Sequence, residues 1–474
     1  MMQAPAQLSG GSVGLWADRR RRHALRGPRR RSRGTVLIAT MWILIVLAGM
    51  VLAFAGAMRI EGACSANATA QQQASAVENG AIQYVLAFLD GLEGRVPTES
   101  EMPCQGIQIG RGAFWIIRPD YEDGRTEAYG VVDEASKLNL NTATAEMLAA
   151  LPEMTPEIAA AIVDWRDSDS DLTAGGAESE YYLLLPDPYE CKNAPLETVE
   201  ELLLVMLMSR ELLFGEDTNR NGRLDDNEND ADETDPPDDR DGTLDVGLYH
   251  LVTVYSSESY DTGPESQRIN VNQAGTRQLT DLLRDVVSGE RLAEVANRAR
   301  LGRPFQNILD FYYRTGLTMK EFEPIAARIT TSNSTSARGL ININTAPKQV
   351  LLCLPGLEES DASALITARS GENVDRGNIA WVADALSQEK AVAIGSLITT
   401  KSYQFSADIV SVAGSGRAFR RCRIVVDASS SPPQVIYRQD LTSLGWPLSR
   451  DILLQLRSGA PMGDVLETAS QETR

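Results

Sequence analysis

The chain has 474 residues, 43% of them hydrophobic and 23% charged, so it is long enough for two or three folded domains. Its formal net charge of −20 disfavours nucleic acid as a partner. It holds two histidines and no H-E-x-x-H or G-x-x-x-x-G-K-[ST] motif, and we can assemble no catalytic triad around His250, so we expect a protein that is not an enzyme.

The N-terminal segment predicts a membrane anchor. Residues 1–34 hold nine arginines against one acid and end in Gly34, and the next 24 positions, from Thr35 to Met58, carry no charge. That length spans a hydrocarbon core of about 30 Å as a helix and exceeds the apolar region of about 7–15 residues in a cleaved signal peptide. The arginines place the N-terminus in the cytoplasm and the bulk of the chain on the other side.

The helix is expected to continue beyond the membrane, over residues 35–92. The stretch after Met58 has no proline, is rich in Ala and Gln, and sets Ile82, Val85, Leu86 and Leu89 on one stripe. A helix that is apolar first and amphipathic later, behind a basic leader ending in glycine, resembles the type IV pilin and pseudopilin family. A plain signal-anchor is the alternative reading of this segment.

Short β-branched and aromatic runs predict antiparallel strands on both sides of a long helical block. They lie at 112–120 and 127–134, and again at 402–412, 418–428 and 434–441. We therefore predict an α+β fold in which a sheet is built from both ends of the chain and a mainly helical domain is inserted between them.

The helical block contains an internal repeat, N-x-N-x-A, which begins at Asn139, Asn270 and Asn342. In each copy we expect the second Asn to cap the following helix. Copies one and three continue into helical hairpins at 151–166 and 354–369 that resemble the helix-hairpin-helix module. Acidic residues flank both turns, so we interpret the hairpins as packing modules rather than DNA clamps.

The segment DTNRNGRLDDNE, residues 217–228, has the spacing of a calcium-binding loop. Ca²⁺ takes six to eight oxygen ligands at about 2.3–2.6 Å, and Gly222 permits the sharp bend that such a loop needs. The predicted ligands are the side chains of Asp217, Asn219, Asn221, Asp225 and Glu228 and the backbone carbonyl of Arg223. A structural Ca²⁺ would brace an acidic insertion whose residues 216–245 carry thirteen acids against three arginines.

A second stretch, residues 238–245, repeats part of this pattern. Asp239, Asp241 and Asp245 are candidate ligands of a second, weaker ion or of an extension of the first site. Pro237 and Leu248 stand where the first and last ligands would be expected, so both readings remain open.

The order of these parts resembles the GspK family, the K-type minor pseudopilins of the type II secretion system. The resemblance covers residues 34 to about 445 and rests on DEASKLNLNTAT, LPEMTPEIAAAIVDWRDSD, YYLLLPDPYECKNAPLETVEELLLV and ININTAPKQVLLCLPGL. It implies a pilin-like fold, cleavage by prepilin peptidase between Gly34 and Thr35, and Ala39 as the fifth mature residue. The long leader, Thr35 and Ala39 depart from the usual pilin pattern, in which the fifth residue is Glu.

The resemblance further implies a function at the tip of the pseudopilus. The protein would initiate assembly with the I- and J-type minor pseudopilins and the inner-membrane components of the machinery, for export across the outer membrane. It would be a single-pass protein of the bacterial inner membrane with most of its chain in the periplasm. The alternative is a membrane-anchored helix-hairpin-helix receptor that binds DNA in a competence-like uptake system.

These features divide the chain into six predicted parts. They are the leader 1–34, the N-terminal helix 35–92, strands at 93–135, an inserted helical domain at 136–398, C-terminal strands at 399–448 and a tail at 449–474.

Overall fold

The computed structural model describes residues 33–119, 128–231, 233–234, 236–259, 268–371, 375–414, 416–460, 463 and 465. It divides into two compact units, Met1–Ser65 and Ala66–Arg474. The predicted leader lies outside the described residues except for Arg33 and Gly34.

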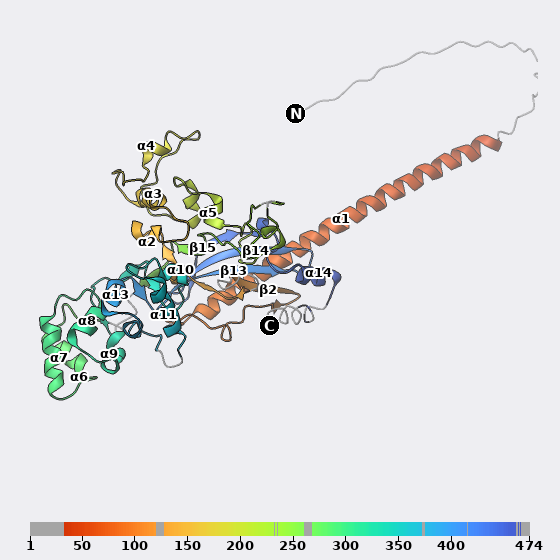
Figure 1. Ribbon diagram of the computed structural model, residues 1–474. Helices are drawn as coiled ribbons and strands as arrows, with labels where there is room; N and C mark the ends of the chain where they lie inside the picture. The colour runs from red at the N-terminus through yellow and green to blue at the C-terminus, as the bar shows by residue number, and fades with distance from the viewer. Residues whose placement is uncertain are drawn as a thin grey trace, which may run out of the picture. The chain divides into compact units, whose positions relative to one another are not determined.

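Helix α1 (Arg33–Leu89) runs without interruption for 57 residues (Figure 1). Its large apolar side chains from Val36 to Ile60 are exposed, and Leu52 is 73% exposed. Among the described helices it is the one that is long and apolar enough to cross a membrane. Exposed hydrocarbon along a whole helix is unfavourable in water, so this part of α1 is suited to lipid. The predicted long N-terminal helix is confirmed.

The later part of α1 packs on a sheet. Val77, Val85 and Leu89, eight and four residues apart along one stripe, are buried in a core with residues of the central strands. Small side chains earlier in the stripe allow a close approach, and the Ser411 hydroxyl donates a hydrogen bond of 3.3 Å to the carbonyl of Ala74. Amphipathic spacing thus fixes which face of the helix covers the sheet.

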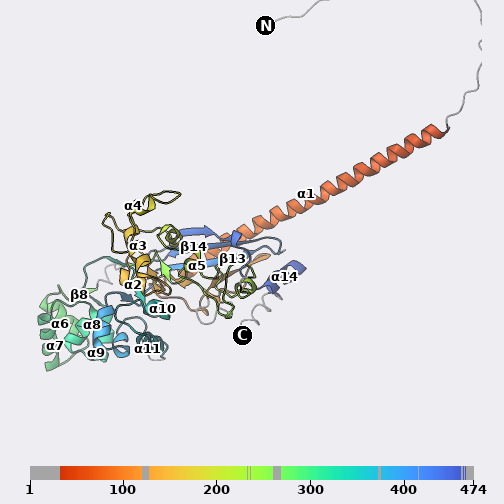
Figure 2. The same ribbon diagram turned by 45° about the horizontal axis from the view of Figure 1, so that its top comes forward.

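The main sheet has seven antiparallel strands, with the order β1-β2-β13-β14-β15, and β3 and β4 pair with β2 and β13. Its strands come from both ends of the chain (Figures 1 and 2). They are β1 (Ile107–Ile109), β2 (Gly112–Arg118), β3 (Ala128–Tyr129), β4 (Val132–Asp133), β13 (Gln404–Val412), β14 (Phe419–Asp427) and β15 (Gln434–Asp440). The predicted antiparallel sheet is confirmed, but the strand expected over 127–134 is two short strands separated at Gly130, whose φ is +143°.

Consecutive residues of β14 face opposite sides of the sheet. Arg420 pairs with Glu78 of α1, whereas Arg421 reaches the carbonyls of Asn219 and Arg220. Because side chains of a strand alternate in direction, α1 lies on one face and the loop at 217–228 lies on the other.

The residues between β4 and β13 form a mainly helical region with its own hydrophobic core. Its helices are α2 (Ala145–Ala149), α3 (Pro156–Arg166), α4 (Ser179–Tyr182), α5 (Arg210–Phe214), α6 (Thr276–Arg284), α7 (Glu290–Leu301), α8 (Ile308–Thr315), α9 (Met319–Ala326), α10 (Lys348–Leu351), α11 (Glu359–Arg369), α12 (Val382–Ala385) and α13 (Gln388–Ile394). Helices α6 to α9 lie together in both views, apart from α3 and α4 (Figures 1 and 2). Helix α14 (Arg450–Ser458) follows the sheet and buries Ile452 and Leu456 in the core of the sheet.

Short strand pairs and 3₁₀ turns complete the fold. The 3₁₀ turns are η1 (Glu134–Ser136), η2 (Val199–Leu204), η3 (Asp226–Glu228) and η4 (Thr442–Leu444). The pairs are β5 (Leu138–Asn139) with β6 (Val252–Thr253), β8 (Ile269–Asn270) with β9 (Ile329–Thr330) and β11 (Ile341–Asn342) with β12 (Ile398–Thr399), all parallel, and β7 (Ser257–Ser259) with β10 (Ser336–Arg338), antiparallel.

In all three N-x-N-x-A motifs the backbone amide of the second Asn donates to the side-chain oxygen of the first, a geometry that differs from the predicted helix cap. In the first copy the Asn141 amide donates to the side chain of Asn139, and the Asn141 side chain clamps both backbone groups of Leu196, at 2.8 and 2.9 Å. Thr144 caps α2 instead. The second Asn therefore ties its module to a distant segment, because a loop of two further residues separates it from the helix, and the predicted capping role is wrong.

Each predicted hairpin range, 151–166 or 354–369, contains one helix, α3 or α11, whereas the first helix of the pair, α2 or α10, ends before the range begins. A tight turn joins the two helices of each pair. In α2–α3 the turn residue Glu153 has a φ of +56°, and in α10–α11 Gly356 at the matching position has a φ of +75°. The arginine that ends each second helix donates to two carbonyls of its own module; for Arg369 these are Ile343 at 3.1 Å and Ala346 at 2.7 Å. These hydrogen bonds hold the end of the second helix against the chain that precedes the first helix of the same module.

Candidate metal loop and anchor segment

The loop at 217–228 begins three residues after α5 and is shaped by Asp217, which is 1% exposed. Its carboxylate accepts hydrogen bonds of 2.9 Å from the backbone amides of Asn221 and Gly222. Gly222 has a φ of +69°, and a Cβ there would lie 2.4 Å from the Cα of Pro119. Glycine is required at this position for both its conformation and its lack of a side chain.

Four of the predicted ligands converge. The side-chain amides of Asn219 and Asn221 both donate to Oδ2 of Asp225, at 2.6 and 2.9 Å. The Asp225 amide in turn donates to Oε2 of Glu228 at 2.9 Å, inside a capping box that closes η3. Asp217, Asn219, Asn221 and Asp225 thus lie around one turn of chain, with Glu228 held by the backbone beside them.

Burial and like charge oppose ionisation in this loop. Glu228 is 1% exposed, and its Oε1 has no hydrogen-bond partner. Burial, and to a lesser degree Asp217, Asp225 and Glu216, raise the pKa of Glu228 to about 8. Burial also raises the pKa of Asp225. The Arg223 charge lowers the pKa of Asp225 but does not outweigh burial.

Residues far away in the sequence fix the loop on the sheet. Arg421 is fully buried, pairs with Asp408 at 2.6 Å, and donates to the carbonyls of Asn219 at 2.5 Å and Arg220 at 2.6 Å. His250 contacts Asp217 at 3.4 Å. Sequence reasoning missed Arg421, because no local pattern marks a residue that acts about 200 positions away, and it gave His250 no role in this loop although His250 is 33 residues from Asp217.

The metal prediction itself is not tested by these contacts. Within the part of the chain that the structure describes, no group of three or more Asp, Glu, His or Cys side chains is arranged to hold a metal ion. Asp225 is instead met by two amide groups. Calcium binding by this loop stays a prediction.

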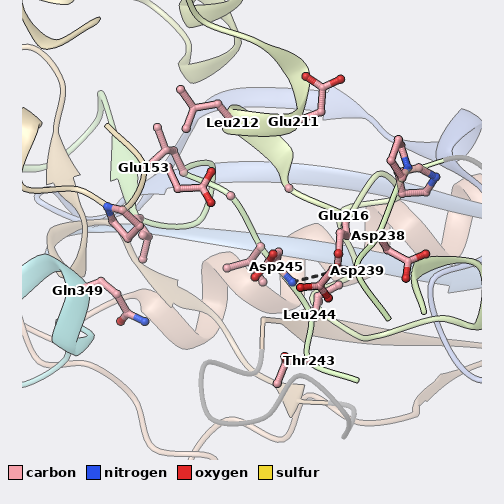
Figure 3. A pocket seen from close by; sticks show the side chains of 18 residues that line it. Glu153, Glu211, Leu212, Glu216, Asp238, Asp239, Thr243, Leu244, Asp245 and Gln349 are labelled. Carbon is pink, nitrogen blue, oxygen red and sulfur yellow. Dashed lines mark hydrogen bonds between the residues drawn. The ribbon is translucent and has the colours of Figure 1, made fainter. Parts of the chain in front are cut away.

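The second acidic stretch borders a pocket of about 490 Å³. Of its three candidate ligands, Asp239 and Asp245 line the pocket and Asp241 does not. Glu216 joins them, and its Oε2 accepts the Asp245 amide at 3.3 Å (Figure 3). Among the described residues that line the pocket there is no Lys or Arg, and Glu153 contributes a further carboxylate. The structure does not gather the three candidates into one site.

The anchor residues lie at the start of α1. Gly34, Thr35 and Ala39 are exposed in its first turns. A protease would have to reach a backbone that is helical from Arg33 onward in this structure. Cleavage between Gly34 and Thr35 stays a prediction.

Comparison with protein families identifies the class of the segment before this loop. Residues 132–214 match the model of the family described as Type II secretion system (T2SS), protein K. The matched segment runs from β4 to the end of α5 and includes the first N-x-N-x-A motif and the α2–α3 hairpin. The resemblance to the GspK family is confirmed over this segment.

A chain of a solved complex is also similar to this chain. It is a chain of the GspK-GspI-GspJ complex from enterotoxigenic Escherichia coli, with 13% sequence identity and a TM-score of 0.39. The similarity covers 81% of this chain and 98% of the other. No curated protein matches the sequence.

Proposed function

We propose that the protein is a K-type minor pseudopilin of a type II secretion system. The family match over residues 132–214 is the observation that carries this proposal. The long apolar helix supports it, because the same helix continues into a stripe packed on an antiparallel sheet, as a pilin-like fold requires.

The proposed topology follows from charge. The arginines before Gly34 hold the N-terminus in the cytoplasm, so α1 crosses the bacterial inner membrane once and the rest of the chain is periplasmic. Prepilin peptidase would cut between Gly34 and Thr35. The mature protein would then present Ala39 as its fifth residue.

Ala39 supports a place at the tip of the filament. In a pilin array the fifth-position Glu pairs with the N-terminal amine of a neighbour, and burying either charge alone in lipid is costly. A subunit with Ala39 cannot form that pair, which is tolerated where no neighbour lies above. We infer that the protein joins I- and J-type pseudopilins, starts pseudopilus assembly with inner-membrane components of the machinery, and has no enzymatic role.

A DNA-receptor function is not favoured. Glu153 and Glu157 lie at the turn of the first hairpin. Glu358, Glu359 and Asp361 lie at the turn of the second hairpin, which follows the third repeat. These carboxylates would repel phosphate.

We also propose that Ca²⁺ braces the loop at 217–228. The unpartnered, buried Oε1 of Glu228 and the hard oxygen donors of Asp217, Asn219, Asn221, Arg223 and Asp225 fit this ion. A bound Ca²⁺ would offset the repulsion from Asp217 and Asp225 that helps to raise the pKa of Glu228. The stretch with Asp239, Asp241 and Asp245 would hold at most a second, weaker ion.

Co-purification tests the pseudopilin function. The full chain is produced in membranes together with the I- and J-type pseudopilins of the same cell and with prepilin peptidase, and is then extracted with detergent. We expect a ternary complex and a mature N-terminus at Thr35. Recovery of the chain alone, with Met1 to Gly34 still attached, would contradict the proposal, and a gel-shift assay with duplex DNA would then test the receptor alternative.

Calcium is tested on the same detergent-extracted chain. Asp217→Asn removes a predicted ligand, and Asp226→Asn is the matched control because Asp226 is exposed and outside the ligand set. We expect bound Ca²⁺, counted by equilibrium dialysis, to fall by one ion per chain in D217N and to be unchanged in D226N. Equal counts in both variants would refute the loop as a site.

A further inference from the structure

Four buried oxygen atoms without a hydrogen-bond partner gather in the segment between α3 and η2. They are both carboxylate oxygens of Glu178, Oδ1 of Asp167 and Oδ1 of Asn193. Glu178 is only 6% exposed. A buried carboxylate without a partner costs roughly several kcal/mol of folding free energy, so a neutralising partner is expected.

The three residues come from stretches that hydrogen bonds hold together. The Cys191 amide donates to the hydroxyl of Ser179 at 3.1 Å, and its thiol contacts the carbonyl of Asp164 at 3.6 Å. Asn193 donates to the carbonyl of Asp169 at 2.6 Å. The end of α3, the chain after it, the start of α4 and the loop at 191–193 therefore meet at one place.

Close packing leaves little room for a side chain at this point. Asp164 is fully buried, and its carboxylate accepts the Thr173 amide at 3.2 and 3.3 Å. A Cβ on Gly176, two residues before Glu178, would lie 2.2 Å from Oδ2 of Asp164. The orphaned oxygens are thus enclosed by the protein and out of reach of a side chain from another molecule.

The charged groups that shift the pKa of Glu178 are all negative, whereas Arg166 lowers the pKa of Asp167. Burial raises the pKa of the Glu178 carboxyl, and so do the nearby carboxylates of Asp164, Asp167 and Asp169. Among the described residues none of these four carboxylates forms an ion pair with Lys or Arg. Arg166, which lies beside them in sequence, donates instead to carbonyls before α2. Water could satisfy the hydrogen bonds of these oxygens but would not neutralise them.

We propose that Asp167, Glu178 and Asn193 bind a divalent metal ion of the Ca²⁺ class, at a site separate from the loop at 217–228. Two carboxylates and an amide oxygen are hard ligands of the kind that Ca²⁺ takes, and Asp164 and Asp169 add negative charge around them. In the structure these carboxylates are not drawn into one close group. A bound cation would have to draw these ligands together.

The ion would tie the C-terminal end of α3 to the start of α4 and the loop at 191–193. It would order the segment that carries the exposed Leu183 and Leu184, which are 52% and 86% exposed. This role does not depend on the pseudopilin function or on the 217–228 loop.

Terbium luminescence tests the site, because Tb³⁺ replaces Ca²⁺ and emits when a nearby tryptophan transfers energy to it. Trp165 is buried in α3 next to Asp164 and is the local sensitiser. The probe is Tb³⁺ added to the full chain in detergent after treatment with EDTA, with Ca²⁺ as competitor. The variants are Glu178→Gln and Asp167→Asn. Glu180→Gln is the matched control, because Glu180 is exposed in α4, the helix that Glu178 precedes.

We expect at least a tenfold loss of tryptophan-sensitised emission in E178Q and D167N, and one Ca²⁺ fewer per chain by equilibrium dialysis. E180Q should behave as the unaltered chain, and Trp165→Phe should lose the emission while keeping the ion. E178Q should fold in EDTA, because it removes an uncompensated buried charge. D217N should keep this emission whatever happens at its own loop, which separates the two sites.

Equal emission and equal ion counts in E178Q, D167N and E180Q would overturn the proposal. Glu178 would then be a neutral buried carboxylic acid. If E178Q alone failed to fold, D167N would decide the question by the same two readouts.

Discussion

Replacing Arg421 with Met should release the loop at 217–228 from the sheet. The guanidinium is fully buried, forms three hydrogen bonds with Asp408, and donates to the carbonyls of Asn219 and Arg220. Met fills a similar volume but leaves one carboxylate and two carbonyls without their donor. Removing one partner of a buried ion pair costs about 3–5 kcal/mol. We expect most of this cost to appear as local opening of the loop, because the guanidinium joins the carbonyls of Asn219 and Arg220 to β14.

Hydrogen exchange of the full chain in detergent and EDTA measures this opening. A cost of about 3–5 kcal/mol corresponds to exchange roughly a hundredfold to several thousandfold faster. The relevant amides are those of Asn221 and Gly222, which are bonded to Asp217. Arg420→Met is the matched control, because Arg420 lies next in β14 but points to α1.

Exchange in the loop of a folded R421M protein that stays within threefold of the R420M control would refute this reasoning. It would mean that the contact between Arg421 and the loop carries little of the free energy that holds the loop in place.

Three further outcomes are expected. Gly222→Ala should lower the free energy of unfolding by about 1–3 kcal/mol because of the positive φ, and further because the new Cβ would clash with Pro119. The melting temperature should fall accordingly, and an unchanged melting temperature would argue against the clash. Burial disfavours the charge of Glu134, but Lys137 and Arg423 outweigh this effect and lower the pKa of Glu134 to about 2. The stability that comes from this charge is therefore complete above about pH 4.5 and is lost as the pH falls towards 2. Glu134→Gln should flatten the acid side of the profile of melting temperature against pH. Adding Ca²⁺ at about a hundred times its dissociation constant should stabilise the chain by about 2.7 kcal/mol per site over EDTA, whereas Mg²⁺ at the same concentration should give less.

The local sequence pattern was sufficient to predict the helices and strands in which apolar residues recur at regular spacing. The apolar run from Thr35 to Met58 predicts an exposed helix, and the period of three to four residues after it predicts the face that packs on the sheet. Alternation of β-branched residues predicts β13, β14 and β15 within two residues of their observed ends. These features depend on neighbours in sequence, so the sequence contains them.

Local pattern failed where a side chain is satisfied by a distant partner. Asn141 resembles a helix cap, yet its amide clamps Leu196, 55 residues away. A cap and a tertiary clamp use the same donor and acceptor groups, so composition and spacing cannot distinguish them.

The two candidate metal sites differ in the same way: one could be predicted from local spacing and the other could not. Spacing alone picks out the loop from Asp217 to Glu228, because a calcium loop draws its ligands from one short stretch of chain. The unpaired charge of Glu178 is invisible in the sequence, where it is one acid among many. Only the folded chain removes Glu178 from water and brings it near enough to Asp167 for the two charges to interact. A carboxylate is costly only when burial takes away its solvent without supplying a cation.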